Sequence, residues 1–326
     1  MVTTANSVSR ADVSSARQPR FSGMSHVSLP CRNLEESKLF YSQVLGGELF
    51  HEIAGFVEYR TADIVIGLSE QEEGWTGPND EYPHYAFYLD GQNFELMKKW
   101  LERYAVPNYP YRRDQTALIY FRDPSGNLFE LYCDRGYEGI ESLPLAPPRR
   151  GGPAIDFRRL NYNWNTGALS AGAHMAKPHL SAFAHASLFC ADLEQAKRFF
   201  TQVLGGELIH DVDGFAEVRV AGIIIGLTVR PGRTTARNAE FPHYAFFAET
   251  EDFLPMVAWL RQNGVVTTEP WTRDGVKGLL YFRDPAGNLF EMYCRQIKDA
   301  ASFARGAKQG GNYTIDLAAL EYRWRG

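Results

Sequence analysis

The 326-residue chain lacks the features of several protein classes. No apolar stretch approaches the roughly 20 residues that a membrane-spanning helix needs, and the N-terminus has no apolar core of a secretory signal. The formal net charge is -5 and the basic residues are scattered or confined to short runs such as 147–150, so no basic surface for nucleic acid is indicated. These absences predict a cytoplasmic protein whose partners are neither membranes nor nucleic acids.

Cysteine is also scarce. The four cysteines form two pairs in repeated sequence contexts, Cys31 with Cys190 and Cys133 with Cys294, and none belongs to a CxxC motif. This pattern favours reduced residues near strand ends over disulfides or a structural zinc site.

What the chain does contain is an internal repeat. The stretch "CRNLEESKLFYSQVLGGELF" from Cys31 matches "CADLEQAKRFFTQVLGGELI" from Cys190, at an offset of 159 residues. Likewise "LIYFRDPSGNLFELYC" ending at Cys133 matches "LLYFRDPAGNLFEMYC" ending at Cys294, and each copy is followed by a tail with the pattern IDxxxLxYxW. The chain is therefore a duplication of one unit.

The repeat predicts the domain organisation. We expect a disordered leader over 1–22, because this segment is rich in Ser, Ala, Thr and Arg without periodicity, although a transit peptide is an alternative. The first module then spans 23–135, a linker carrying one copy of the tail spans 136–180, the second module spans 181–296, and the C-terminal tail spans 297–326. The tail is expected to lie as a strap across its module or to reach a partner chain.

Within each module the hydrophobic periodicity changes in the same order. An alternating strand over 25–31 precedes a helix capped by Asn33 or Asp192 and ended by a Gly-Gly pair. Strands over 56–60 and 64–68, a strand beginning at His84, a helix with Phe94 and Trp100 on one face, and strands near 117–122 and 127–133 follow. An α+β fold is predicted.

Three polar residues in each half stand out on these strands. Glu130 alternates with apolar neighbours on a strand that otherwise reads as buried, so its carboxylate needs a charged partner or a metal. The set repeats with 58 residues between the two histidines in both halves, followed by 46 and 48 residues to the glutamate. The candidate metal ligands are His26, His84, Glu130, His185, His243 and Glu291.

Two histidines and one carboxylate form a facial triad, which leaves the opposite positions of a divalent ion open. The competing interpretation is a set of hydrogen-bonded core histidines beside a buried glutamate. The sequence leaves open whether the ligands combine within one module or across the two.

At these residues the chain resembles the vicinal oxygen chelate superfamily, which includes glyoxalase I, fosfomycin-resistance thiol transferases, bleomycin-binding proteins and extradiol dioxygenases. The most specific stretches are "YFRDPSGNLFE" and "YFRDPAGNLFE", with support from "VLGGEL" and "PHYAF". The resemblance implies two tandem modules, each of paired βαβββ units that form a cupped mixed sheet around a metal site.

Departures from the family patterns narrow the function. The fourth strand reads "IVIGL" or "IIIGL" and lacks the glutamate that glyoxalase I uses as a fourth ligand. The two-module length resembles the extradiol dioxygenases. The histidine that their signature has several residues before its tyrosine is absent here, because 111–113 read Tyr-Arg-Arg and 272–274 read Thr-Arg-Asp.

The resulting expectation is an iron(II) dioxygenase or close relative that chelates a small aromatic or vicinally oxygenated substrate and uses O2. Alternatives are a glyoxalase-like lyase or thiol transferase that uses Mn, Ni or Zn as the electrophile, and a non-catalytic protein that binds a small molecule; a homodimer is left open. Tyr281 and Tyr120 are candidates for proton transfer. Candidate substrate-binding residues are Arg283, Arg122, Tyr293 and Tyr132, with an ion pair to Asp284 or Glu291 as the alternative role of Arg283.

Overall fold

A computed structural model describes residues 18–71, 81–146, 155–161, 164, 176–230, 240–307, 311, 313–320 and 324. Most of the expected leader and the basic run at 147–150 lie outside the described residues. Strand β1 begins at Phe21, so the last two residues expected in the leader belong to a strand. Among the described helices, none has both the length and the apolar character needed to cross a membrane.

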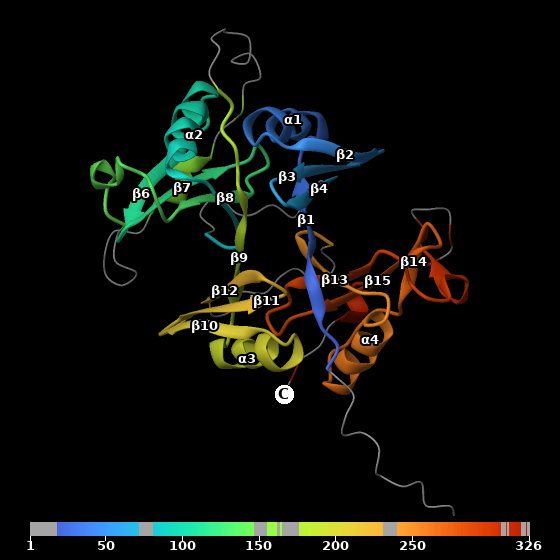
Figure 1. Ribbon diagram of the computed structural model, residues 1–326. Coiled ribbons are helices and arrows are strands. Elements are labelled where there is room, and N and C mark those ends of the chain that lie inside the picture. The colour runs from blue at the N-terminus through green and yellow to red at the C-terminus, as the bar shows by residue number, and fades with distance from the viewer. Residues whose placement is uncertain are drawn as a thin grey trace, which may run out of the picture.

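The two halves contain the same succession of elements (Figure 1). The first half comprises β1 (Phe21–Cys31), α1 (Leu34–Leu39), a π-helical turn (Phe40–Val44), β2 (Glu48–Ile53), β3 (Phe56–Thr61), β4 (Ile64–Glu70), β5 (His84–Tyr88), α2 (Gly91–Arg103), β6 (Asn108–Arg113), β7 (Thr116–Arg122) and β8 (Leu128–Cys133). The second half comprises β9 (Ala182–Cys190), α3 (Leu193–Arg198), a π-helical turn (Phe199–Val203), β10 (Glu207–Val212), β11 (Phe215–Val220), β12 (Ile223–Val229), β13 (His243–Ala248), α4 (Phe253–Gln262), β14 (Trp271–Arg273), β15 (Lys277–Arg283), β16 (Leu289–Cys294) and the short β17 (Ala304–Arg305).

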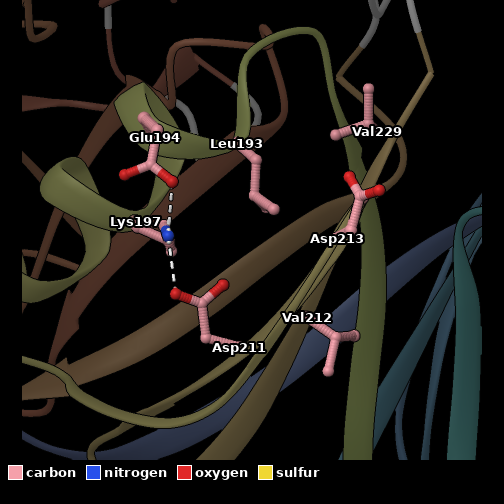
Figure 2. Close-up of a pocket in the computed structure, with 8 residues that line it drawn as sticks. Leu193, Glu194, Lys197, Asp211, Val212, Asp213 and Val229 are labelled. Atoms are coloured by element: carbon pink, nitrogen blue, oxygen red, sulfur yellow. Dashed lines mark hydrogen bonds and ion pairs between the residues drawn. The ribbon is translucent and has the colours of Figure 1, made fainter.

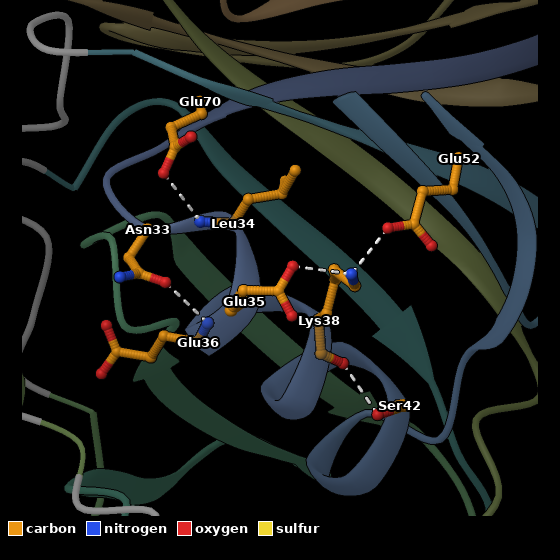
Figure 3. Close-up of polar contacts among 8 residues, drawn as sticks. All are labelled: Asn33, Leu34, Glu35, Glu36, Lys38, Ser42, Glu52 and Glu70. Atoms are coloured by element: carbon orange, nitrogen blue, oxygen red, sulfur yellow. Dashed lines mark hydrogen bonds and ion pairs between the residues drawn. The ribbon is translucent and has the colours of Figure 1, made fainter. Parts of the chain in front are cut away.

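The start of α1 shows how the local sequence fixes the first helix (Figure 3). The Asn33 side chain accepts a hydrogen bond from the Glu36 backbone at 2.9 Å, as the N-cap pattern predicts. The Leu34 backbone donates to the Glu70 carboxylate at the end of β4, and Lys38 pairs with both Glu35 and Glu52. Strands β4 and β2 are therefore tied to the helix.

Each large sheet combines strands from both halves of the chain. One sheet has the order β17-β14-β15-β16-β13-β1-β4-β3-β2, and the other has the order β10-β11-β12-β9-β5-β8-β7-β6. The junctions are the antiparallel pairs β1 with β13 and β5 with β9. Strands β1–β4 thus share a sheet with β13–β17, whereas β9–β12 share one with β5–β8.

The main core lies on the helix-covered faces of the sheets. The α2 helix docks on the π-helical turn of its own half, where the Trp100 indole donates to the Gln43 carbonyl at 3.2 Å. Trp259 on α4 makes the matching bond to the Val203 carbonyl at 2.9 Å. Each module therefore buries its helices internally, while the sheets connect the two modules.

A buried aspartate organises each of the two repeated turns, between β7 and β8 and between β15 and β16. One Asp123 oxygen accepts from the Ser125 and Asn127 backbones, and the Asn127 amide donates to the Pro30 carbonyl at 3.0 Å. Asp284 makes the same backbone bonds in the second half. The turn thereby fixes the start of the strand that carries the glutamate.

The repeated tails pack within the chain as straps. Phe157 and Leu160 lie in a cluster with Tyr111, Tyr120 and neighbouring strand residues, on the face of the sheet that carries Glu130. In the second tail Leu320 packs in the corresponding cluster. The closing tryptophans return to the helical side, where Trp164 contacts Phe40 and Trp324 contacts Phe199 with ring centroids 5.5 and 5.6 Å apart.

All four cysteines are free and buried. Burial raises the pKa of the Cys31 and Cys190 thiols to about 12, which keeps them protonated. The prediction of reduced, structural cysteines is confirmed.

Candidate metal centre

The strand junctions bring histidines of opposite halves together. His26 on β1 lies opposite Ala245 on β13, and Ala245 lies beside Glu291 on β16. His243 occupies the same face of β13 two residues before Ala245. We call the cluster of His26, His243 and Glu291 site I; its counterpart in the other sheet, His84, Glu130 and His185, is site II.

Site I is compact and buried. The His26 and His243 Nε2 atoms lie 3.7 and 3.4 Å from Glu291 Oε2, and 3.4 Å from each other. All three residues are buried, and Glu291 is completely so.

Site II has the same arrangement with shorter distances. The His84 and His185 Nε2 atoms lie 3.2 and 3.1 Å from Glu130 Oε2, and 3.3 Å from each other. In each site the candidate ligand atoms all lie within 4.8 Å of one another, the spacing expected around one ion. The candidate ligands of each cluster therefore come from both modules, which is one of the two arrangements that the sequence left open.

Backbone carbonyls set the orientation of two of the four imidazoles. His84 Nδ1 lies 2.9 Å from the Glu81 carbonyl, and His243 Nδ1 lies 2.8 Å from the Glu240 carbonyl. Because a carbonyl only accepts, Nδ1 must carry the proton, and the lone pair of Nε2 points into the cluster. This is the tautomer that metal-bound histidines adopt.

The glutamates remain charged in spite of their burial. Burial by itself raises their pKa, but the neighbouring imidazoles outweigh it: the pKa of Glu291 falls to about 2, and that of Glu130 falls well below its usual range. The histidines differ, because burial lowers the pKa of His243, whereas at His84 the Glu130 contacts overcome burial and raise the pKa.

In site I the carboxylate lacks hydrogen bonds from the described residues. Neither carboxylate oxygen of Glu291 accepts a hydrogen bond from any described residue, and both are shielded from solvent. A buried carboxylate in that condition is costly, and a divalent cation is the partner that two imidazoles and one carboxylate suit. The residues present therefore fit a bound metal ion.

The predicted tyrosines surround these clusters. Tyr281 lies opposite Glu291 on the neighbouring strand, and Tyr120 lies opposite Glu130. Their rings contact His243 and His84 respectively, each with centroids 5.5 Å apart. Tyr293 and Tyr132 contact His26 and His185 at 6.0 and 6.4 Å.

The predicted arginines are engaged elsewhere. Arg122 donates to the Gly126 carbonyl at 2.6 Å, and Arg283 donates to the Gly287 carbonyl at 2.7 Å. Both guanidinium groups are buried and brace the turn that precedes the glutamate strand. A role in binding substrate remains a prediction for them.

Sequence reasoning did not single out four residues that the structure places beside the sites. The Tyr111 hydroxyl donates to Glu130 Oε1 at 3.4 Å, and the Arg113, Arg273 and Glu58 side chains project from the metal-facing sides of their strands. Alternation along β6 and β14 is the signal that could have located three of them. In the sequence, residues 111–113 and 272–274 stand out only because the histidine of the extradiol dioxygenases is missing there.

A surface groove lies apart from both sites. It is formed by the start of α3 and the β10–β11 turn, and Lys197 there pairs with Glu194 and Asp211 (Figure 2). None of its lining residues belongs to either cluster. Its charges pair with each other, so the groove supplies no obvious ligand for a metal.

Two curated relatives and two solved structures illustrate what the chain is similar to. It is 29% identical over 111 residues to the glutathione transferase FosA of Serratia marcescens, covering 33% of this chain and 79% of that protein. It is 25% identical over 228 residues to the catechol-2,3-dioxygenase of Bacillus subtilis (strain 168), covering 64% and 75%.

A Bacillus subtilis protein provisionally described as a dioxygenase superposes with a TM-score of 0.61 at 17% identity, covering 89% of this chain and 93% of that one. Glyoxalase I from Zea mays superposes with a TM-score of 0.54 at 13% identity, covering 84% and 92%. At these identities the structural likeness concerns the fold alone.

The family model provides the broadest match. It covers residues 23–131 and 182–292, more than half of the chain and one match in each half. The α+β architecture of two tandem modules with mixed sheets agrees with it. The chain therefore belongs to the glyoxalase/bleomycin resistance protein/dioxygenase superfamily.

Proposed function

We propose that the protein is a metal-dependent enzyme of the extradiol dioxygenase type, acting on a small aromatic or vicinally oxygenated substrate. The observation that carries this proposal is the pair of two-histidine, one-carboxylate clusters, a ligand set typical of non-haem iron(II) oxygenases. The similarity to a catechol-2,3-dioxygenase over 64% of the chain supports it.

His26, His243 and Glu291 would hold iron(II) in site I, and His84, His185 and Glu130 would hold it in site II. When bound, the ion supplies Lewis acidity toward two adjacent substrate oxygens and a place for O2. Both sets of ligands come from a single chain, so a second copy is not needed to complete either site.

The surrounding residues would manage the protons and exclude water. Burial and the nearby Glu291 charge raise the pKa of the Tyr281 phenol well above its usual range, so it stays protonated and can donate a hydrogen bond to a substrate oxyanion. Tyr120 is in the same condition near Glu130. Tyr293 and Tyr132 would line the approach to the histidines.

The second candidate is a lyase or thiol transferase in which Mn, Ni or Zn acts only as an electrophile. The similarity to a glutathione transferase favours it, as does the absence of a histidine on β6 and β14. The extradiol dioxygenases that the sequence resembles have a histidine near the ion at this position. Neither β6 nor β14 provides one.

Oxygen consumption separates the two candidates. Protein purified anaerobically would be analysed for metal and loaded with iron(II), and dissolved O2 would be followed with a series of catechols. We expect stoichiometric oxygen uptake that depends on iron. Metal binding without any oxygen uptake, together with turnover supported by Mn or Zn, would favour the lyase or transferase; tight ligand binding without metal would indicate a non-catalytic binding protein.

A further inference from the structure

Site I is flanked by a cation and an anion for which the described residues provide no hydrogen bond or ion pair. Arg273 ends β14 on the same face as Trp271, which pairs with Leu279, and that face continues to Tyr281 and Glu291. Within the described part of the chain, no residue accepts a hydrogen bond from Arg273 or forms an ion pair with it, and its Nε is shielded from solvent.

The opposite wall of the same sheet carries Glu58 on β3. Glu58 is only 9% exposed, lies beside Gly67 of β4, and is likewise without a hydrogen bond or ion pair among the described residues. Gly67 pairs with Ser28, two residues from His26, so Glu58 lies on the metal-facing side. Its carboxylate and the Arg273 guanidinium are separated by more than ion-pair distance.

The two residues nevertheless lie within electrostatic range of each other. Burial disfavours the charged form of Arg273, but the charges of Glu291 and Glu58 outweigh it and raise the pKa of Arg273. Five strands separate β14 from β3 in the sheet order, and a flat sheet would hold them about 29 Å apart at about 4.8 Å per strand. The sheet must therefore curve strongly around site I and bring its two walls together.

An unpaired, half-buried guanidinium beside a metal site is a costly arrangement in the absence of ligand. A guanidinium offers paired donors in a fixed plane that match a carboxylate. We propose that Arg273 binds a carboxylate on the substrate of site I, so that this site selects vicinally oxygenated compounds that also bear an anionic group. The inference rests on the proposed function insofar as the substrate is held by the ion.

Glu58 provides a second test of the proposal. Its negative charge on the facing wall partly offsets Arg273, so removing it should strengthen the binding of an anion. Site II provides a matched control, because Arg113 is the corresponding residue on β6 but is exposed to solvent. Solvent screening should make its contribution small.

The test compares two probes that differ only in the carboxylate: catechol and 3,4-dihydroxybenzoate. His185→Ala protein, in which site II is disabled, would be loaded with zinc to prevent turnover, and the dissociation constants measured by calorimetry. We expect 3,4-dihydroxybenzoate to bind about 10- to 100-fold more tightly than catechol, as charge-assisted hydrogen bonds allow. Arg273→Gln should bring the two probes to parity while leaving catechol within about twofold.

The variants discriminate a binding role from a structural one. Arg273→Lys should retain part of the preference, Glu58→Gln should increase it, and Arg113→Gln in the protein with both sites intact should leave it unchanged. If Arg273→Gln lowered zinc content or weakened both probes equally, Arg273 would be a partner of Glu291 and the inference would be overturned. An unaltered preference, or failure of both probes to bind, would overturn it as well.

Oxygen uptake keeps the two proposals separate. A carboxylate preference that depends on Arg273, in a protein whose iron-loaded form consumes no O2, would retain the inference and reject the dioxygenase. Oxygen uptake with an unaltered preference in Arg273→Gln would do the reverse.

Discussion

Site I and site II have equivalent candidate ligands, yet the structure surrounds them differently. The His26 side chain in site I is 7% exposed, whereas the equivalent His185 in site II is 17% exposed. In site II the Tyr111 hydroxyl donates to Glu130, but the corresponding aromatic residue of site I, Trp271, makes no hydrogen bond to Glu291. Both copies of the duplicated unit thus have the two histidines and the glutamate, while the residues around the carboxylate differ.

This comparison indicates that a bound metal ion stabilises the two sites to different extents. In the absence of an ion, Glu130 lies within hydrogen-bond distance of the Tyr111 hydroxyl and of His185 Nε2, whereas Glu291 accepts no hydrogen bond from the described residues. Site I therefore carries the larger penalty when empty and gains the more from binding a cation.

The largest expected effect is the loss of metal on removing one ligand. His185→Ala should release the ion from site II, although His84 and Glu130 lie in the other half of the sequence, because ligands combine across the modules. Metal content should fall from two equivalents per chain to one, as measured by elemental analysis after gel filtration. His26→Ala is the matched variant for site I. Retention of both ions in His185→Ala would contradict the assignment.

A second prediction concerns the protein without metal. Glu291→Gln removes a buried charge that only the longer contacts to His26 and His243 hold, so it should lower the stability of the metal-free form by at most about 1 kcal/mol. Glu130→Gln removes an acceptor that His185 and Tyr111 already use, so it should lower stability by more, about 1 to 3 kcal/mol. Urea unfolding in the presence of a chelator measures both. Equal effects in the two sites would remove the distinction drawn above.

The sequence identified the repeat and the candidate ligands, but it could not show which of these residues lie together. Alternation placed Glu130 and His84 on one face of their strands, which is a local property. The pairing of β1 with β13 and of β5 with β9 depends on contacts between segments about 220 and 100 residues apart, and the two copies are so similar that either pairing fits the pattern. Only the fold decides which copy supplies the first histidine.

Alternation along the strand selects Arg283 but does not reveal the contact that holds it. Arg283 lies on the metal-facing side of β15, which makes it a predicted substrate-binding residue, and the Gly287 carbonyl in the following turn engages its guanidinium. Strands β2 and β14 were not expected at all, because β2 is exposed along its whole length and β14 has only three residues. Neither leaves a hydrophobic alternation long enough to detect.

A third prediction tests the phenol that distinguishes site II. Tyr111→Phe should weaken metal binding at site II by about tenfold, because it removes the group that orients the Glu130 carboxylate. Binding at site I should not change. Competition with a coloured chelator in the His26→Ala background, where site II alone is intact, measures the affinity. An unchanged affinity would show that the Tyr111 contact at 3.4 Å contributes only packing.

The smallest expected effect concerns the turns that support the two glutamate strands. The Tyr41 hydroxyl donates to Asp123 at 3.0 Å, whereas Phe200 occupies the equivalent position next to Asp284 and has no hydroxyl. Burial raises the pKa of both carboxyls, to about 6 for Asp123 and to about 7 for Asp284. The missing phenol accounts for the direction of this difference, because a donor favours the charged form.

Exchanging tyrosine and phenylalanine at positions 41 and 200 should therefore exchange the pKa shifts of the two aspartates. A carboxyl whose pKa is raised in the folded state contributes stability in full only below its ordinary pKa near 3.8. This stability is lost as the pH rises through the folded-state pKa, so the charged Asp284 destabilises the fold fully above about pH 7. Phe200→Tyr should lower that pKa and stabilise the protein by about 1 kcal/mol at pH 8, with a smaller gain at pH 5, where the carboxyl is protonated. Tyr41→Phe should have the opposite sign and the same pH dependence. Urea unfolding at the two pH values distinguishes this from a packing effect, since a pH-independent change in either variant would mean that the phenol acts by filling space and not through the aspartate.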